Sequence, residues 1–181
     1  MDIDVLCLNA GLSLNTEDRE AKRTEDGFEL TVGTNHLGHF YLNDLLLPKI
    51  NKQRGRIVVT ASGVHDPESP GGGVGKAASL GNLRGFEEDG PLFEMVDGAA
   101  YNADKAYKDA KLCNGGMSLA YMATSPDTNT QGQYYISPPG SSKFGEAAFG
   151  KEFCVGSVSK EAQDDAKAGK LWELSAKLLG I

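Results

Sequence analysis

Two tyrosine–lysine pairs stand close together between residues 101 and 111. Tyr101 precedes Lys105 by four residues, and Tyr107 precedes Lys111 by the same interval. On a helix, residues four apart lie about one turn from each other, so each ammonium would lie beside its own phenol. A neighbouring cation favours the phenolate and lowers the tyrosine pKa from about 10, which gives a proton donor that works near neutral pH. The same spacing also occurs on ordinary solvated helix faces, so the remaining sequence has to distinguish the two.

Strands and helices alternate along the chain, which predicts an α/β fold with a parallel sheet. Continuous apolar runs at residues 3–10 and 56–62 predict strands buried on both faces, and residues 27–50 predict a long helix closed near Pro48. The other predicted elements are a helix from the tyrosine–lysine stretch towards Met122, a short strand at 132–137 and an amphipathic helix at 160–179.

Ligands bind beyond the carboxyl ends of the strands in such sheets, so the residues after each strand are candidates. Asn9 and Gly11 follow the first strand, and Ser62 follows the second. In the long helix, Phe28, Val32, Asn35 and Leu42 fall near one inward face at helical spacing. Asn35 either satisfies a buried backbone group or holds a water or a lysine in a proton relay; the spacing favours neither.

Two motifs suggest other chemistry but fit it poorly. The run "GGGVGK" has Pro70 and Ala77 where a phosphate-binding loop needs glycine and Ser or Thr, so it predicts a flexible loop within the long connection 65–91, whose length suggests a function. His36 and His39 lie one helical turn apart, but no third ligand accompanies them and His65 is on another element, so we expect no metal site.

Composition excludes several classes of protein. A net charge of -7 without a basic block argues against nucleic acid as a partner. The three cysteines (Cys7, Cys113 and Cys154) are widely spaced, which predicts free thiols in a reducing compartment. No apolar run is long enough to span a membrane, and we expect no signal or transit peptide before residues 3–10.

The order "LNAG", "TNHLGHF", "RIVVTAS" and Tyr-x-x-x-Lys resembles the short-chain dehydrogenase/reductase family. Within it, "DGFELTVGTNHLGHF", "LGNLRGF", "KAYKDAKLCN" and the C-terminal segment resemble the light-dependent protochlorophyllide oxidoreductase branch. This resemblance covers most of the chain and matches the catalytic tyrosine of that branch to Tyr107, with Lys111 as its lysine. Tyr101 and Lys105 would then belong to the approach to the helix.

The resemblance implies a Rossmann-like fold and a reduction with NADPH as cofactor. Hydride would go to one carbon of a C=C bond in a protochlorophyllide-like tetrapyrrole, and Tyr107 would protonate the neighbouring carbon. Lys111 would lower the tyrosine pKa and hold the nicotinamide ribose, Asn35 would orient a water that refills the relay, and Ser62 matches the catalytic Ser/Thr position. The residues that would support the adenosine side of the cofactor are Asn9, Ala10 and Gly11.

The sequence also departs from that family. Three parts of the family pattern find no match in this sequence: the family's own first strand, the glycine-rich turn that binds the pyrophosphate, and a later strand. The single domain 1–181 therefore resembles a partial doubly wound sheet. Its parts 1–114 and 115–181 resemble two joined family segments, as in a truncated or aberrantly spliced product. We therefore expect the isolated chain to have no reductase activity.

Alternative functions are a related dehydrogenase acting on an alcohol or ketone such as a retinoid, and a non-catalytic fragment. The family resemblance implies a plastid location, the alternative being cytoplasmic, and an oligomer is possible.

Overall fold

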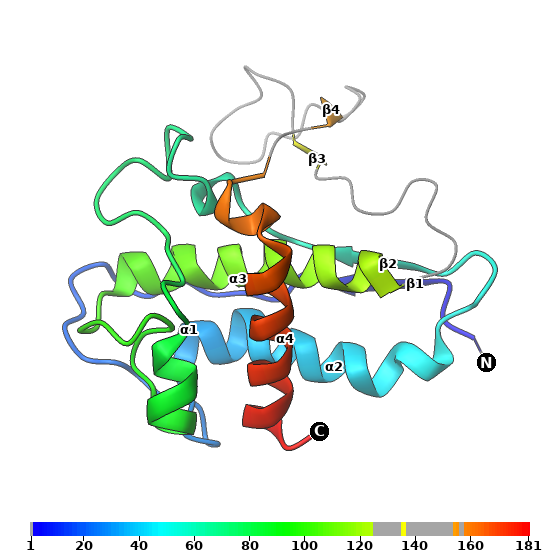
Figure 1. Cartoon of the computed structure of the whole chain (residues 1–181), viewed down its shortest axis with the longest axis horizontal. Helices are drawn as coiled ribbons and strands as arrows, with labels where there is room; N and C mark the ends of the chain where they lie inside the picture. Colours follow the sequence, from blue (N-terminus) through cyan, green and yellow to red (C-terminus); the bar gives the residue numbers. More distant parts are fainter. Residues whose placement is uncertain (1, 125–134, 137–153, 156–157) are drawn as a thin grey trace.

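The computed structural model describes residues 2–124, 135–136, 154–155 and 158–181, with side chains for 2–115 and 158–181 (Figure 1). Strands β1 (Val5–Leu8) and β2 (Arg56–Val59) pair in parallel, with Leu8 opposite Val59. Strands β3 (Tyr135–Ile136) and β4 (Cys154–Val155) form a separate antiparallel pair. The predicted α/β class and the parallel pairing of the two apolar runs are confirmed, while residues 132–134 and 137 of the predicted third strand lie outside the described residues.

The β1–β2 sheet is buried on one face only, so the prediction of strands buried on both faces is wrong. Leu6 and Leu8 are buried against Phe40, whereas Val5 is 56% exposed and Val58 is 49% exposed. The hydrophobic cluster beneath the sheet comes from the helix that contains Phe40 and from the C-terminal helix. Since side chains alternate along a strand, one covered face buries every second residue.

The predicted helix 27–50 is built from four pieces. They are α1 (Leu30–Val32), the π-helical turn η1 (Gly33–Leu37), α2 (Gly38–Leu46) and the 3₁₀ turn η2 (Leu47–Lys49), which contains Pro48. The buried carboxylate of Glu29 caps the start by accepting the N–H groups of Thr31 and Val32 at 3.0 and 2.7 Å. A cap of this kind satisfies N–H groups that have no partner within the helix.

The π-helical turn explains why one inward residue was predicted wrongly. Leu42 is 40% exposed, whereas Asn43 is buried. A π turn holds one residue more than an α turn, which rotates every later side chain by about 100°. The rotation takes Leu42 off the inward face that contains Val32 and Asn35, and it brings Asn43 onto that face.

Much of the long connection 65–91 is part of the core. It contains the end of η3 (Gly63–His65), the π-helical turn η4 (Gly85–Asp89) and the start of η5 (Gly90–Leu92). Three large apolar side chains from this region are fully or almost fully buried: Leu80, Leu83 and Phe86. Its glycine-rich run is held by Lys108, whose ammonium donates to the carbonyls of Val74 and Lys76. The segment therefore contributes to the core, and a function for it stays a prediction.

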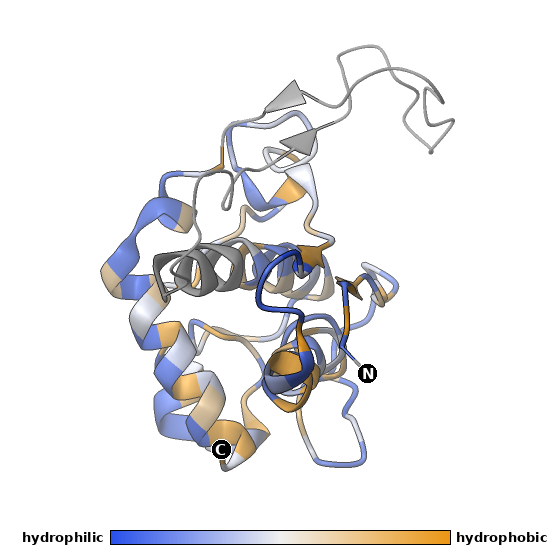
Figure 2. Ribbon diagram, turned by 90° about the vertical axis from the view of Figure 1, so that its right-hand side faces the viewer, coloured by the Kyte–Doolittle hydropathy of each residue, from blue (hydrophilic) through white to orange (hydrophobic). Residues whose placement is uncertain are grey.

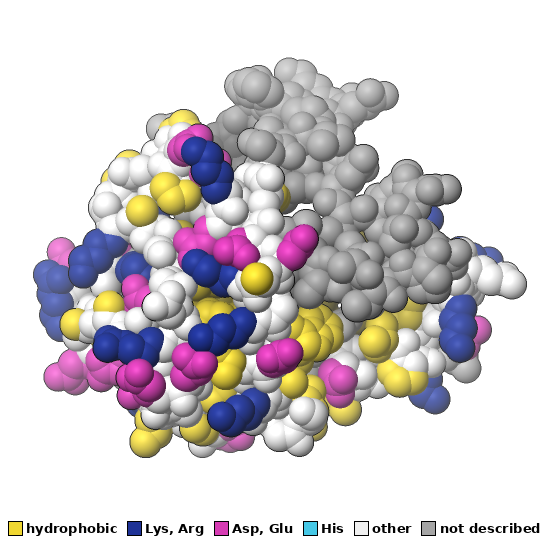
Figure 3. Space-filling model, viewed as in Figure 1, with side chains coloured by type: hydrophobic (Ala, Val, Ile, Leu, Met, Phe, Trp, Pro, Cys, Tyr) yellow, Lys and Arg dark blue, Asp and Glu magenta, His cyan; other side chains and the backbone are white. Residues whose placement is uncertain are grey.

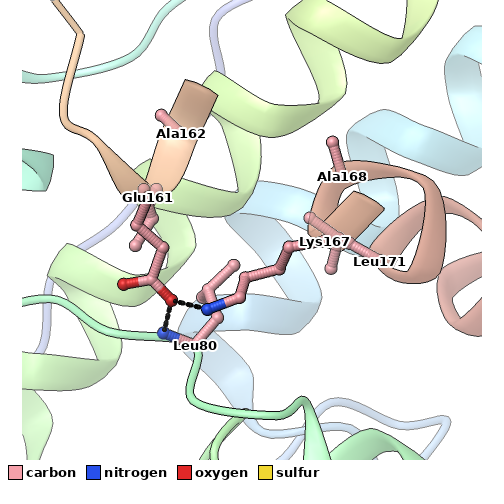
Figure 4. Close-up of a pocket in the computed structure, with 7 residues that line it drawn as sticks. Leu80, Glu161, Ala162, Lys167, Ala168 and Leu171 are labelled. Carbon is pink, nitrogen blue, oxygen red and sulfur yellow. Dashed lines mark hydrogen bonds and ion pairs between the residues drawn. The ribbon is translucent and has the colours of Figure 1, made fainter. Parts of the chain in front are cut away.

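The C-terminal helix fastens this segment to the rest of the molecule. Helix α4 (Asp165–Leu179) crosses α3 (Ala103–Thr124) and follows the 3₁₀ turn η6 (Glu161–Gln163) (Figure 1). Glu161 accepts the N–H of Leu80 at 3.0 Å and the ammonium of Lys167 at 2.7 Å (Figure 4).

The predicted C-terminal helix is confirmed, with Asp164 as its N-cap and Gly180, at φ 71°, as its C-cap. Leu171 and Leu174 are buried, and α4 presents hydrophobic and hydrophilic residues together, as an amphipathic helix does (Figure 2). Trp172 contacts the ring of Phe40 edge-on, with ring centroids 4.6 Å apart. This contact joins α4 to the layer beneath the sheet.

Over the face shown in Figure 3, acidic and basic side chains are interspersed, without a broad basic surface among the described residues. None of the helices in the described ranges is both long enough and apolar enough to cross a bilayer. Cys7 is exposed and Cys113 is buried, and both are free thiols. The side chain of Cys154 lies outside the described residues.

Candidate active site

The two parallel strands end side by side, which brings their following residues to one edge. Thr60 donates its backbone N–H to the carbonyl of Leu8 at 3.0 Å and its hydroxyl to Asn9 Oδ1 at 2.9 Å. Asn9, Ala10 and Gly11 are exposed beyond β1, as expected for a carboxyl edge that receives a ligand. Thr60, which the sequence analysis did not single out, thus links the two strand ends.

Asn35 is fully buried in the π-helical turn and holds the backbone of Leu12. Its Oδ1 accepts the N–H of Leu12 at 2.8 Å, and its Nδ2 donates to the carbonyl of Leu12 at 2.8 Å. Of the two alternatives for Asn35, the structure contains the bond to a backbone group. The π-helical turn that contains Asn35 is also a feature that occurs frequently at functional sites.

Gly11 allows the backbone to approach two candidate side chains closely. A Cβ at this position would lie 3.3 Å from Asn35 Oδ1 and 3.7 Å from Lys111 Nζ. Contacts of 3.0–3.4 Å are tighter than most side chains make, so a residue other than glycine would press on Asn35. Gly11, Asn35 and Lys111 therefore meet at the carboxyl edge of the sheet.

Lys111 reaches from α3 to the end of β2. Its ammonium donates to the carbonyl of Thr60 at 3.0 Å, and the residue is only 4% exposed. Burial lowers the pKa of Lys111 from its ordinary value, because leaving water disfavours the charged form. No carboxylate forms an ion pair with Lys111 among the described residues.

Tyr107 is half-buried and stands one turn before Lys111 on α3. The ammonium of Lys111 lies 5.7 Å from the centroid of the Tyr107 ring. The predicted pair is therefore close in space, with a lysine that is not neutralised by an acid in the described structure.

Tyr101 and Lys105 are arranged differently. Helix α3 begins at Ala103, so Tyr101 precedes it while Lys105 lies inside it. The buried hydroxyl of Tyr101 has no hydrogen-bond partner among the described residues, and burial, with smaller effects of Glu29 and Asp18, raises its pKa to about 12. This environment keeps the phenol protonated and makes it a poor donor near neutral pH.

Ser62 lies beyond β2 and caps η3, where its Oγ accepts the N–H of Val64 at 3.5 Å. Its carbonyl accepts a hydrogen bond from the ring of His65 at 2.7 Å. Among the described residues no hydrogen bond joins Ser62 to Tyr107 or Lys111. The structure therefore brings Ser62 to the same edge without placing its hydroxyl on the tyrosine–lysine pair.

The buried histidines serve other contacts. The Nε2 of His36 lies 2.9 Å from Ser175 Oγ, and burial lowers the His36 pKa to about 4, which keeps the ring neutral at physiological pH. Burial, followed by the nearby charge of Lys111, lowers the pKa of His39. The described residues contain no group of three side chains that could hold a metal ion.

Comparisons with known proteins bear on this arrangement. Residues 1–84 match the family model "short chain dehydrogenase". The chain is 30% identical to the chloroplastic protochlorophyllide reductases of Cucumis sativus and Chlamydomonas reinhardtii. Each of these alignments covers 99% of this chain and 58% of the relative. The chain thus spans under two thirds of the length of these curated relatives.

A crystal structure of an uncharacterised protein from Mycobacterium paratuberculosis has the same fold. Its TM-score is 0.70 at 24% identity, and the match covers 99% of this chain and 68% of that one. The alignments to the curated relatives extend over 244 residues, more than the 181 of this chain, so those relatives hold residues without a counterpart here. The chain is therefore similar to the short chain dehydrogenases over residues 1–84 and to protochlorophyllide reductases over nearly its whole length, and the solved structure shows a similar fold.

Proposed function

We propose that this chain has the function of a nicotinamide-dependent oxidoreductase of the protochlorophyllide reductase type, which acts on a tetrapyrrole C=C bond in a plastid, and that residues 1–181 alone are inactive. The observation that carries the proposal is the setting of Lys111. Its buried ammonium has no carboxylate partner in the described structure, lies beside Gly11 and stands one turn from Tyr107. The similarity to chloroplastic protochlorophyllide reductases supports the substrate class and the location.

In this proposal Tyr107 delivers a proton to the substrate carbon next to the one that receives hydride. NADPH, when bound, supplies that hydride. Lys111 stabilises the tyrosinate that remains, because a cation near a phenol favours its charged form. The lowered pKa of Lys111 also makes its ammonium a readier source of the proton that restores Tyr107.

The remaining residues hold the site in shape. Asn35 holds the backbone of Leu12, which keeps the preceding Gly11 against Lys111. Thr60 joins the end of β1 to the carbonyl that Lys111 binds. Ser62 would contact the substrate from the end of β2, as its match to the family position suggests.

The described residues fit one end of NADPH. The lack of a side chain at Gly11 lets the backbone approach Asn35 and Lys111 closely, and Lys111 can donate to a ribose hydroxyl. Dinucleotide binding in this fold also relies on a strand, a glycine-rich turn and a helix N-terminus at the pyrophosphate. Residues 1–181 contain no such glycine-rich unit before a helix, so we expect this polypeptide alone to bind NADPH too weakly to measure.

Two forms of the protein test the proposal. One is the 181-residue chain. The other is a chimera in which the N-terminal strand–turn–helix unit of the Cucumis sativus relative precedes residue 1 and the later residues of that relative without a counterpart here are restored between residues 114 and 115. With NADPH and protochlorophyllide, the chimera should reduce the pigment only under illumination, since the pigment absorbs the light. A chimera that binds both molecules but reduces nothing, beside an active intact relative, would contradict the proposal.

A second candidate function is a non-catalytic binding role. It is favoured by the outer face of the β1–β2 sheet, where Val5, Cys7 and Val58 are exposed. Titrating the monodisperse chain with NADPH while following nicotinamide fluorescence separates the candidates. Saturable micromolar binding would favour a reductase complete in itself, whereas no binding in either chain or chimera would favour the non-catalytic role.

A further inference from the structure

His65 is a buried histidine with two different hydrogen bonds, one on each ring nitrogen. It is 1% exposed. Its Nδ1 lies 2.7 Å from the carbonyl oxygen of Ser62, and its Nε2 accepts the backbone N–H of Ser159 at 3.3 Å. Since a carbonyl only accepts and an N–H only donates, the partners assign the proton of the neutral ring to Nδ1.

These bonds join two segments that are far apart in sequence. Ser62 follows β2, whereas Ser159 precedes η6 and α4. Helix α3 packs against the same histidine, because a Cβ at Gly115 would lie 4.0 Å from His65 Cδ2 and 3.5 Å from the Cβ of Ala162. His65 therefore lies where the end of β2, α3 and the entry to α4 meet.

The carbonyls of Thr60 and Ser62, two residues apart, are held by side chains from different elements. Lys111 of α3 donates to the first at 3.0 Å, and His65 donates to the second at 2.7 Å. A turn of the backbone between these residues would move both carbonyls together. The direction of the Thr60 carbonyl, and with it the place of the Lys111 ammonium, therefore depends on the bond from His65.

We infer that His65 is a positioning residue: its Nδ1–H holds the Ser62 carbonyl and so fixes the strand end to which Lys111 is bound. The inference rests on the proposed function only because that function assigns a role to Lys111. The bond between Nε2 and Ser159 has a separate effect, since it fastens the entry to α4. The two ring nitrogens thus have distinguishable consequences, and substitutions can separate them.

The test compares three substitutions in the 181-residue chain. His65→Asn keeps an N–H donor near the position of Nδ1, His65→Gln places an amide oxygen near the position of Nε2, and His65→Leu removes both bonds. Lysines are labelled by reductive ¹³C-methylation, and the pKa of Lys111 is followed by NMR, with Lys111→Arg to assign its signal. Amide hydrogen exchange at Ser159 reports the second bond.

We expect Lys111 to keep its lowered pKa in His65→Asn and to titrate closer to the ordinary lysine value of about 10.4 in His65→Gln and His65→Leu. Exchange at Ser159 should accelerate in His65→Asn and stay slow in His65→Gln. Equal Lys111 titrations in the Asn and Gln variants would overturn the inference. If His65→Leu fails to fold, the Asn and Gln pair still decides. Because no turnover is measured, an inactive chimera in the light assay would count against the proposed function alone.

Discussion

The two tyrosine–lysine pairs share a spacing but not an environment. The ammonium of Lys105 lies 2.6 Å from Asp109, 2.9 Å from Asp97 and 2.7 Å from the Ser79 carbonyl, whereas the ammonium of Lys111 donates to the Thr60 carbonyl at 3.0 Å. Burial alone would lower the Lys105 pKa, but the two carboxylates raise it above its ordinary value. Burial lowers the Lys111 pKa without such compensation.

The difference supports the proposal that Tyr107 and Lys111, and not Tyr101 and Lys105, form the proton relay. Lys105 is neutralised and serves to tie α3 to the segment 79–97, where Asp109 also accepts the N–H of Ser79 at 2.9 Å. Burial raises the Asp109 pKa to about 7, with Lys105 opposing the shift, so this network is costly to leave incomplete. Lys111 keeps a charge that can act on Tyr107.

The largest expected contrast is in turnover. In the active chimera, Tyr107→Phe should reduce turnover about 10²–10⁴-fold, the usual effect of losing a general acid. Tyr101→Phe should change turnover far less, because that phenol stays protonated. Steady-state rates under saturating light measure both, and equal losses would mean that the assignment of the acid is wrong.

Stability should show the opposite contrast. Lys105→Met leaves Asp109 and Asp97 without their cation and should cost about 3–5 kcal/mol, the usual effect of breaking a buried ion pair. Lys111→Met removes one hydrogen bond to a carbonyl and should cost about 1 kcal/mol. Urea unfolding of the 181-residue chain measures both. A larger loss for Lys111→Met would show that its charge is structural.

Asn35→Ala should have a smaller effect on stability. It tests the residues that surround Lys111, as opposed to those that surround Lys105. The substitution leaves the N–H and the carbonyl of Leu12 unpaired and should cost about 1–3 kcal/mol. Hydrogen exchange at the Leu12 amide should accelerate, while amides near Lys105 keep their protection. Unchanged exchange at Leu12 would contradict the role of Asn35 as a backbone clamp.

The smallest effect is in the pH dependence of stability. With a folded-state pKa below its unfolded value, Lys111 binds fewer protons when folded, so stability rises with pH up to about 10.4. Lys105 has the opposite sign: its contribution is present below the ordinary pKa and is lost as pH rises through the higher folded value. Urea midpoints from pH 8 to 10, in roughly half-unit steps, should rise less steeply in Lys111→Met than in the parent. Identical slopes would exclude a lowered Lys111 pKa.

Local patterns predicted the elements well, because they depend on spacing that the sequence displays. The runs at residues 3–10 and 56–62 became the parallel pair β1–β2, and the acidic start and apolar stripe of residues 160–179 became η6 and α4. The burial of the strands could not be predicted in the same way. It depends on whether other elements cover each face, and Val5 and Val58 show that one face is bare among the described residues.

The sequence predicted which residues follow the strands and which tyrosine and lysine share a helix. It did not predict the hydrogen bonds and ion pairs that these residues form. Nothing in the spacing distinguished Lys105 from Lys111, because Asp97 reaches Lys105 from the separate segment before α3. The sequence did not predict the contacts of Thr60 and His65. Lys111 binds the backbone carbonyl of Thr60 and His65 binds that of Ser62, and a hydrogen bond to a backbone carbonyl leaves no pattern in the sequence. The only available signal was their position, at the strand end and just beyond it.

The π-helical turn at Gly33–Leu37 has a consequence for how this chain tolerates changes in length. In a regular helix, deleting one residue rotates everything that follows by about 100° and turns a buried face outward. Within this turn, a deletion of Thr34 should restore an ordinary α-helical repeat and leave Val32 and Asn43 on the inward face they already share. Such a deletion should displace Asn35 and break its two hydrogen bonds to the backbone of Leu12. The turn is thus a place where the helix can lose a residue and keep its packing while the strand end beside Lys111 loses its clamp.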